Sequence, residues 1–385
     1  MHQIDPFSVN SPTEVQFGLG SSKALPKLLP SSKAPIVLVQ GASGVQSAAF
    51  VRELRRQGRQ VYIVRQKGEP SIDTVNSALG KLLGRKISAV VACGGGSVID
   101  AGKILAFLLE HKKRLPTDFS KIDPADLEYR RDIRSIAIPT TAGTGAEVTA
   151  NAVLSVPSLA AKVSIRGKAL FPDIALVDPV LMKTAPIQVT INSGLDAVTQ
   201  VIESYTSLAA TPFSDALSLP AISTGLRSLQ NIVDHDDQEA WSEMAWVSLS
   251  SGLALANSGL GAAHGLASVL GGQYVAPHGA LCGRLVVPVL RSNLRNAANG
   301  SIANKRLITC VTTIAQVFAP IEGGDFVSGL DRWIDRNNVP RLRDWGVQDS
   351  DIESMAAQSI GASSSKKNAV PLKPQDLERV LQEAL

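Results

Sequence analysis

Residues 88–110 read SAVVACGGGSVIDAGKILAFLLE, an apolar run followed by three glycines and a long, mostly apolar segment. The first run predicts a strand buried on both faces, and the segment after the glycines predicts a helix. Glycines at such a junction allow a ligand close to the backbone, and the N–H groups at a helix start attract phosphate. The residues from Gly94 to Ser97 therefore predict a site for a dinucleotide pyrophosphate. An ordinary tight turn is the alternative, because these residues lack the spaced G-x-G-x-x-G pattern.

The alternation of strands and helices extends on both sides of this stretch, from about residue 36 to 178. Buried strands are predicted at Ile36–Val39, Val61–Val64, Ser88–Cys93, Ser135–Ile138 and Ile174–Val177. Helices are predicted at Ser47–Gln57 and Ile72–Leu83, each followed closely by a glycine. This pattern is typical of a parallel sheet covered by helices, so we expect a Rossmann-like α/β domain.

The second half of the chain has a different pattern. After Asp178-Pro179 the strand signals end, and long helical periodicities follow at Gly194–Ser207, Asp215–Leu229 and Glu239–Asn257. Pro179 and Pro186 indicate a boundary near residues 180–188. We therefore predict a dinucleotide-binding α/β domain over residues 1–184 and an all-α metal and substrate domain over residues 185–385.

Composition excludes several classes of protein. The length of 385 residues predicts two domains. The composition, with 44% hydrophobic residues, 19% charged residues and a net charge of +4, is typical of a globular protein. The basic clusters lack interleaved aromatic residues, so we expect no nucleic-acid partner. No apolar stretch is long enough to span a membrane, the start of the chain does not resemble a signal peptide, and three widely spaced cysteines indicate reduced thiols. We expect a cytoplasmic location.

Two further loops follow predicted strands. Residues 135–153 read SIAIPTTAGTGAEVTANAV, where small hydroxyl and glycine residues suit a phosphate or a ribose. Ligands of open α/β sheets bind at the carboxyl ends of the strands, so this loop and the glycines are expected at one crevice. The turn from Gln40 through Gly41 to Gly44 has no acidic residue to repel a 2′-phosphate, which admits NADP as well as NAD; a helix cap explains its small residues equally well.

Acidic, amide and imidazole side chains in the second half suggest a metal site. Asp196 and Gln200 lie four residues apart on a predicted helix and could bind one cation, or form a simple hydrogen-bonded pair; Glu203 could support them. His264 and His278 lie in a nearly uncharged, glycine-rich segment, where their ring nitrogens suit a divalent metal.

Together these motifs resemble the iron-containing, group III alcohol dehydrogenase family over essentially the whole chain. GGGSVID, PTTAGTGAEVT, GLDAVTQVIESYTS, GLGAAHGLAS and PHGALCG occur in the family's order and spacing. The resemblance implies a dinucleotide-binding domain, a helical domain, a homo-oligomer, and metal ligands Asp196, His264 and His278, the two histidines being catalytic. It implies cofactor contacts at Gly95, Gly96, Ser97, Asp100, Thr140, Thr141, Thr144, Asn151 and Lys162, besides Gly41 from the turn above.

The chain departs from the family pattern at two positions. The family's fourth ligand is a histidine four residues after the aspartate, where this chain has Gln200, and Ser268 replaces a second histidine that many members carry. An amide oxygen is a weaker ligand than imidazole for a soft divalent ion, so we predict Gln200 as a modified fourth ligand, for iron or zinc.

Three functions remain open from the sequence. The first is an NAD(P)-dependent oxidoreductase that acts on a small alcohol or aldehyde with the help of the metal. The second is a metal-independent reductase of an oxoacid, like maleylacetate reductases, with His264 or His278 donating to the carbonyl and Arg284 as a candidate anion-binding residue. The third is an inactive nucleotide-binding protein, although such a protein has no need of the three acidic and imidazole groups.

Overall fold

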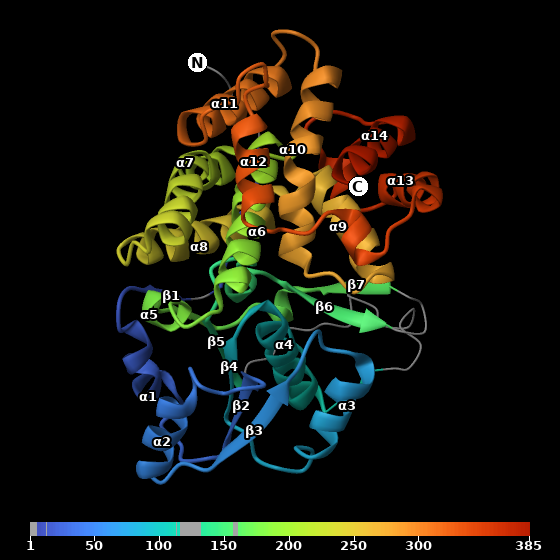
Figure 1. Ribbon diagram of the computed structural model, residues 1–385. Coiled ribbons are helices and arrows are strands. Elements are labelled where there is room, and N and C mark those ends of the chain that lie inside the picture. Colours follow the sequence, from blue (N-terminus) through green and yellow to red (C-terminus); the bar gives the residue numbers. More distant parts are fainter. Residues whose placement is uncertain (1–5, 13, 113, 116–131, 157–160) are drawn as a thin grey trace. The chain divides into compact units, whose positions relative to one another are not determined.

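The computed structural model describes residues 6–12, 14–112, 114–115, 132–156 and 161–385. The chain divides into two compact units, of which one comprises residues 11–185 and the other residues 186–385 with the first ten residues. Figure 1 shows strands concentrated in the first unit and helices in the second. The predicted fold class, an α/β domain followed by a helical one, is confirmed.

The unit of residues 11–185 is built on a six-stranded parallel sheet. Its strands follow the order β1-β8-β5-β4-β2-β3 (Figure 1). They are β1 (Glu14–Phe17), β2 (Ile36–Gly41), β3 (Val61–Gln66), β4 (Ala89–Gly94), β5 (Arg134–Pro139) and β8 (Ile174–Val177). A separate antiparallel pair consists of β6 (Asn151–Val156) and β7 (Ala161–Arg166). The helices are α1 (Leu25–Leu28), α2 (Ala48–Arg56), α3 (Ile72–Gly80), α4 (Gly96–His111) and α5 (Pro179–Met182).

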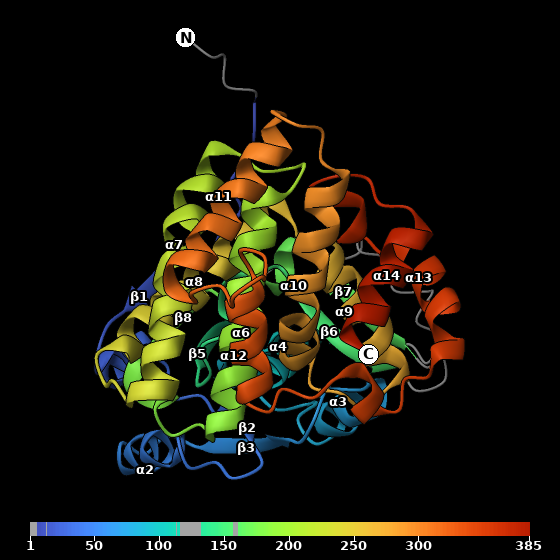
Figure 2. The same ribbon diagram turned by 45° about the horizontal axis from the view of Figure 1, so that its top comes forward.

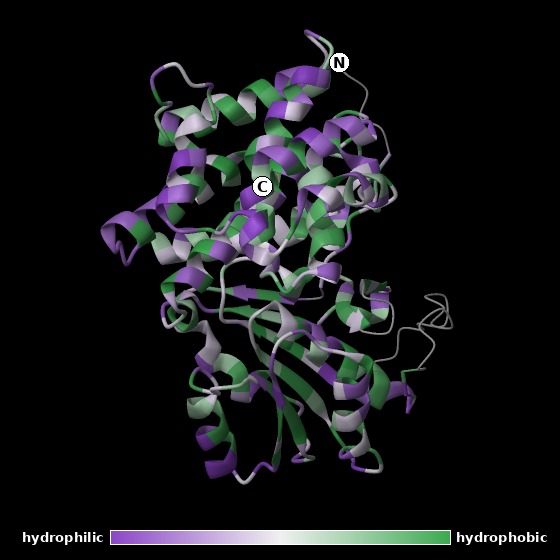
Figure 3. Cartoon of the chain, turned by 45° about the vertical axis from the view of Figure 1, so that its right-hand side comes forward, coloured by the Kyte–Doolittle hydropathy of each residue, from purple (hydrophilic) through white to green (hydrophobic). Residues whose placement is uncertain are grey.

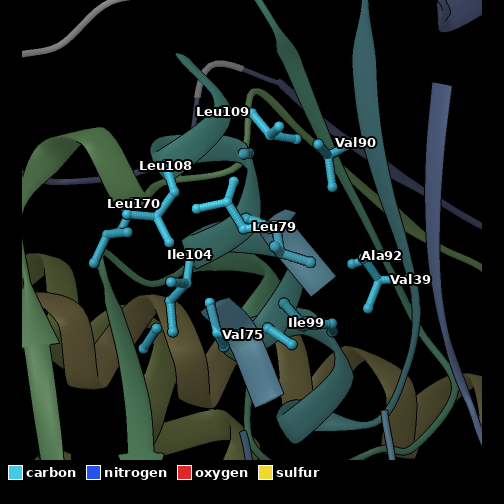
Figure 4. Packing of buried hydrophobic residues seen from close by; sticks show 14 of the residues in the cluster. Val39, Val75, Leu79, Val90, Ala92, Ile99, Ile104, Leu108, Leu109 and Leu170 are labelled. Carbon is cyan, nitrogen blue, oxygen red and sulfur yellow. The ribbon is translucent and has the colours of Figure 1, made fainter. Parts of the chain in front are cut away.

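Both faces of the sheet are buried, which explains why its central strands are continuous apolar runs. On β4, Val90 and Ala92 belong to a cluster with α3 and α4, whereas Val91 and Cys93 belong to a cluster with α1 and α2. Figure 4 shows the first cluster, and Figure 3 shows the hydrophobic strands. Gly102 lets α4 approach β4 closely, because a Cβ there would lie 2.5 Å from the Cβ of Ala92. The helix that follows the glycines is thereby fixed against the strand that precedes them.

The unit that contains residues 186–385 is helical throughout its described part. It contains α6 (Ile187–Thr206), α7 (Pro212–His235), α8 (Ala240–Ser258), α9 (Ala262–Gln273), α10 (His278–Asn296), α11 (Ile302–Val317), α12 (Ser328–Arg336), α13 (Ile352–Ile360) and α14 (Pro374–Ala384). Helix α6 packs against α7, α8 and α10, and α10 also packs against α9 (Figure 2). Helices α6, α9 and α10 therefore form a connected group.

Among the described residues, no single helix has the length and apolar composition needed to cross a membrane. The pair α8 and α9 passes the same test of length and composition only when both are joined across a bend of 97°.

Candidate functional site

The glycine-rich loop and the threonine-rich loop meet at the carboxyl ends of adjacent strands. Strands β4 and β5 pair in parallel, with Gly94 opposite Pro139. A Cβ added to Gly95 would lie 3.4 Å from Thr141 Oγ1, and one added to Gly96 would lie 2.8 Å from Thr144 Oγ1. The loops are therefore in contact, and glycine is required where they approach most closely. Helix α4 begins at Gly96, directly after β4. The N–H groups at its start, at the carboxyl ends of the strands, suit a pyrophosphate.

The turn after β2 lies beside the same strand ends, because Gln40 is paired with Cys93 of β4. Gln40 is buried, and its Oε1 accepts a hydrogen bond from Ser47 Oγ at 2.5 Å. Gly41 is half-buried, and a Cβ built there would meet no atom within 4 Å among the described residues. Gln40 thus holds the turn together, while position 41 has room for a side chain.

Other predicted cofactor residues make contacts within the unit. Asp100 Oδ2 accepts from the Val153 N–H at 2.9 Å, and burial raises the pKa of Asp100. Lys103, which was not predicted from sequence, donates to the Asn151 carbonyl at 2.8 Å. Lys162 forms a 2.5 Å ion pair with Glu69. These contacts fix β6 and β7 to the rest of the unit, and the cofactor roles of Asp100, Asn151 and Lys162 stay predictions.

In the helical unit, four side chains of types that bind metals converge. Asp196, His264, His278 and Cys282 each offer one ligand atom, and these atoms all lie within 4.8 Å of one another. His264 Nε2 is 3.2 Å from Asp196 Oδ1, and Cys282 Sγ is 3.6 Å from His278 Nε2. Three of the four were predicted from sequence. Cys282 was not, although it lies four residues after His278 on α10 and therefore shares its helix face.

Two glycines bring α10 close to α6, which carries Asp196. A Cβ on Gly279 would lie 2.2 Å from the Asn192 carbonyl oxygen, and one on Gly283 would lie 2.6 Å from Leu195 Cδ1. Because they are four residues apart, the two glycines face α6 on consecutive turns. This close packing brings His278 and Cys282 of α10 near Asp196 of α6.

Glu203 lies on α6 two turns beyond Asp196 and orients His264. Its Oε2 is 2.7 Å from His264 Nδ1, and its Oε1 accepts from the Ala263 N–H at 2.6 Å at the start of α9. A carboxylate on Nδ1 keeps a proton on that nitrogen, so Nε2, which faces Asp196, is the nitrogen that becomes free to bind a metal. This arrangement is typical of metal-binding histidines and agrees with the supporting role predicted for Glu203.

The electrostatics of the cluster favour positive charge. Burial opposes ionisation of Asp196, but a hydrogen bond from His264 and the charges of His278 and His264 together lower the pKa of the carboxyl. Burial would lower the pKa of His264, yet charge on Cys282 and the hydrogen bond to Asp196 raise it well above its usual value. Charge on Cys282 likewise raises the pKa of His278. A buried carboxylate, two imidazoles and a thiol therefore form a donor set that fits a divalent cation.

The other predicted polar residues are placed differently. Gln200 Oε1 lies 2.7 Å from Ser251 Oγ on α8, and its role as a ligand stays a prediction. Ser268 is exposed and bonds back to the Gly265 carbonyl in its own helix. Arg284 was a candidate for binding an anionic substrate, and this is wrong: its buried guanidinium binds Asp335 at 2.7 Å and the carbonyls of Val339 and Pro340. It fixes the segment after α12.

Comparisons with known proteins agree with this architecture. Residues 12–179 match the family model described as iron-containing alcohol dehydrogenase, and residues 190–385 match the C-terminal model of the same family. Long-chain-alcohol dehydrogenase 1 of Geobacillus thermodenitrificans is 30% identical over 80% of this chain and 77% of its own. NADPH-dependent butanol dehydrogenase of Clostridium saccharobutylicum is 27% identical over 96% of each chain.

Solved structures show the same relationship. An iron-containing alcohol dehydrogenase from Thermococcus thioreducens superposes with a TM-score of 0.80 at 26% identity, over 98% of this chain and 99% of the other. A 1,3-propanediol oxidoreductase gives a TM-score of 0.80 at 25% identity, over 99% and 100% of the two chains. The chain belongs to the iron-containing alcohol dehydrogenase family, which confirms the resemblance seen in its motifs.

Proposed function

We propose that this chain is an NAD(P)-dependent alcohol dehydrogenase or aldehyde reductase with a divalent metal in its helical unit. The observation that carries the proposal is the convergence of Asp196, His264 and His278 from three helices, with Glu203 holding the imidazole of His264. The family and the named relatives support the same class of reaction and a nucleotide cofactor. The reaction moves a hydride between the alcohol carbon and the nicotinamide, and the hydroxyl proton is released.

The chain's residues have separate tasks in this reaction. The loops from Gly95 to Ser97 and from Thr140 to Thr144 bind the cofactor phosphates and ribose through backbone N–H groups and hydroxyls. Asp196, His264 and His278 hold the metal. A bound divalent ion supplies Lewis acidity to the substrate oxygen, which favours departure of the hydride from the adjacent carbon. The surrounding apolar segment of α9 and α10 strengthens these electrostatic interactions by excluding water.

An oxoacid reductase that uses Arg284 is not favoured, because that guanidinium already binds Asp335 and two backbone carbonyls. An inactive nucleotide-binding protein is not favoured either, since the buried cluster of ionisable groups costs stability unless a bound cation or protons balance it. The predicted homo-oligomer and cytoplasmic location remain predictions, and gel filtration tests the first.

The proposal is tested by NADH and NADPH consumption at fixed metal content, with linear aldehydes from propanal upward and a matching 2-oxoacid series. We expect cofactor oxidation with an aldehyde and the reverse reaction with the corresponding alcohol. An Asp196→Asn variant that is folded by circular dichroism should lose this turnover. Absence of turnover with every aldehyde and alcohol, in metal-loaded protein that binds the nucleotide, would overturn the proposal.

A further inference from the structure

The fourth metal ligand is the position at which this chain departs from the pattern of its family. We propose that Cys282, as a thiolate, supplies this ligand in place of residue 200, and that the resulting site prefers zinc to iron. The inference rests on the proposed function in one respect, which is that the cluster binds a divalent metal.

The position of Cys282 is the first argument. Its sulfur belongs to the group of ligand atoms that lie within 4.8 Å of one another, and it is 3.6 Å from His278 Nε2. The Cys282 side chain is buried, and the close contact of Gly283 with Leu195 holds its turn of α10 against α6. Cys310, by contrast, is buried on α11 and does not belong to this group of ligand atoms.

Charge is the second argument. A buried dication needs nearby negative charge, and ligands bind as their deprotonated forms. The Asp196 carboxylate and a Cys282 thiolate together neutralise a dication. The Glu203 carboxylate does not bind the metal directly, because its oxygens already contact His264 Nδ1 and the Ala263 N–H, at 2.7 and 2.6 Å. With Gln200 as the fourth ligand, the aspartate would be the only anion bound directly to the metal.

The surroundings of Gln200 provide the third argument. Its Oε1 lies 2.7 Å from Ser251 Oγ, so this oxygen has a partner on α8. An amide oxygen is also a neutral and weaker ligand for a soft cation than a thiolate. The pair of Gln200 and Ser251 therefore fixes α6 against α8. The fourth ligand, which the family places at position 200 of α6, is then Cys282 of α10.

The donor set determines the metal preference. One sulfur, two imidazole nitrogens and one carboxylate oxygen match the tetrahedral sites of zinc, and thiolates favour zinc over harder ions. Binding releases the thiol proton, together with any proton on the Nε2 atoms of the imidazoles, to solvent. Four protein ligands do not exclude a substrate oxygen, because zinc centres expand to five ligands in transition states.

The test is X-ray absorption at the zinc edge of the full-length chain, loaded with one equivalent of zinc after chelation. We expect one sulfur neighbour at about 2.3 Å and nitrogen or oxygen neighbours at about 2.0–2.1 Å. Cys282→Ser should lose the sulfur neighbour, and its zinc affinity should fall by at least the ~10- to 100-fold caused by losing a ligand's hydrogen-bond partner. Cys310→Ser, a buried cysteine variant in the same unit, and Gln200→Leu should both keep the sulfur neighbour.

The outcomes separate this inference from the proposed function. Zinc bound by nitrogen and oxygen alone, or no zinc bound at all, overturns the role of Cys282. A sulfur neighbour that persists in Cys282→Ser overturns it as well. Turnover of an aldehyde by wild-type protein that has no sulfur neighbour leaves the proposed function intact, whereas a sulfur neighbour without any turnover overturns the proposed function alone.

Discussion

Replacing Glu203 by glutamine changes the proton position on His264 with little change in shape. The carboxylate now accepts from His264 Nδ1 at 2.7 Å and from the Ala263 N–H at 2.6 Å. If the amide of glutamine keeps its oxygen on Ala263, its NH₂ faces Nδ1 and forces the imidazole proton to Nε2. That nitrogen is the one that lies 3.2 Å from Asp196, and with a proton it cannot bind a metal. If the amide is flipped, its NH₂ group faces the Ala263 N–H, so two donors oppose each other at the start of α9.

Either arrangement weakens metal binding. Loss of such a supporting carboxylate costs about 10- to 100-fold in affinity, or about 1.4–2.8 kcal/mol. Titration of chelated protein with zinc, in competition with a chromophoric chelator, measures the change. Glu243→Gln, on the exposed side of α8, serves as the control and should bind like wild type. Equal zinc affinity in Glu203→Gln and wild type would refute the reasoning that the carboxylate sets the tautomer.

Three further predictions concern cofactor choice, packing and pH. Position 41 has room for a side chain, and Gly41→Asp should raise the KM for NADPH about fivefold or more without raising that for NADH, because a carboxylate near a phosphate costs about 1–4 kcal/mol. Gly41→Asn is the neutral control, and equal KM changes for both cofactors would contradict this prediction. Gly279→Ala should lower the free energy of urea unfolding by about 1–3 kcal/mol, because its Cβ would meet the Asn192 carbonyl, whereas Gly80→Ala should not lower it. Burial raises the pKa of Glu147 from 4.5 to about 7, so the folded state keeps its proton to a higher pH than the unfolded state. The free energy of unfolding should fall by up to about 3 kcal/mol between these pH values, and a fall of the same size in Glu147→Gln would contradict this account.

The central strands could be predicted from sequence because burial on both faces makes them continuous apolar runs. Strand β1 could not, since EVQF is short, mostly exposed and carries a glutamate. Strand β6 follows directly after a threonine-rich loop and β7 alternates polar and apolar residues, and the loop's chemistry obscured both strands. The long helices of residues 186–385 were predicted, but α6 begins at Ile187 and α7 ends at His235, beyond the most periodic parts.

The candidate metal site was predicted in part. Asp196, His264 and His278 follow from residue type and from the family pattern, but the distance between α6, α9 and α10 is set by packing that no local pattern specifies. Cys282 was interpreted as an ordinary reduced thiol because its neighbours in sequence are apolar. Its spacing of four residues from His278 was the available signal, and it gains significance only once α10 is known to begin at that histidine.

The central claim is that turnover depends on a metal held by Asp196, His264 and His278. The most direct measurement is the metal content of purified protein by elemental analysis, together with the rate of NADPH oxidation by an aldehyde, before chelation, after chelation and after addition of zinc. The account predicts about one ion per chain, loss of the rate with the ion, and recovery of both, with neither recovered in His278→Ala. An undiminished rate in protein free of metal would contradict it.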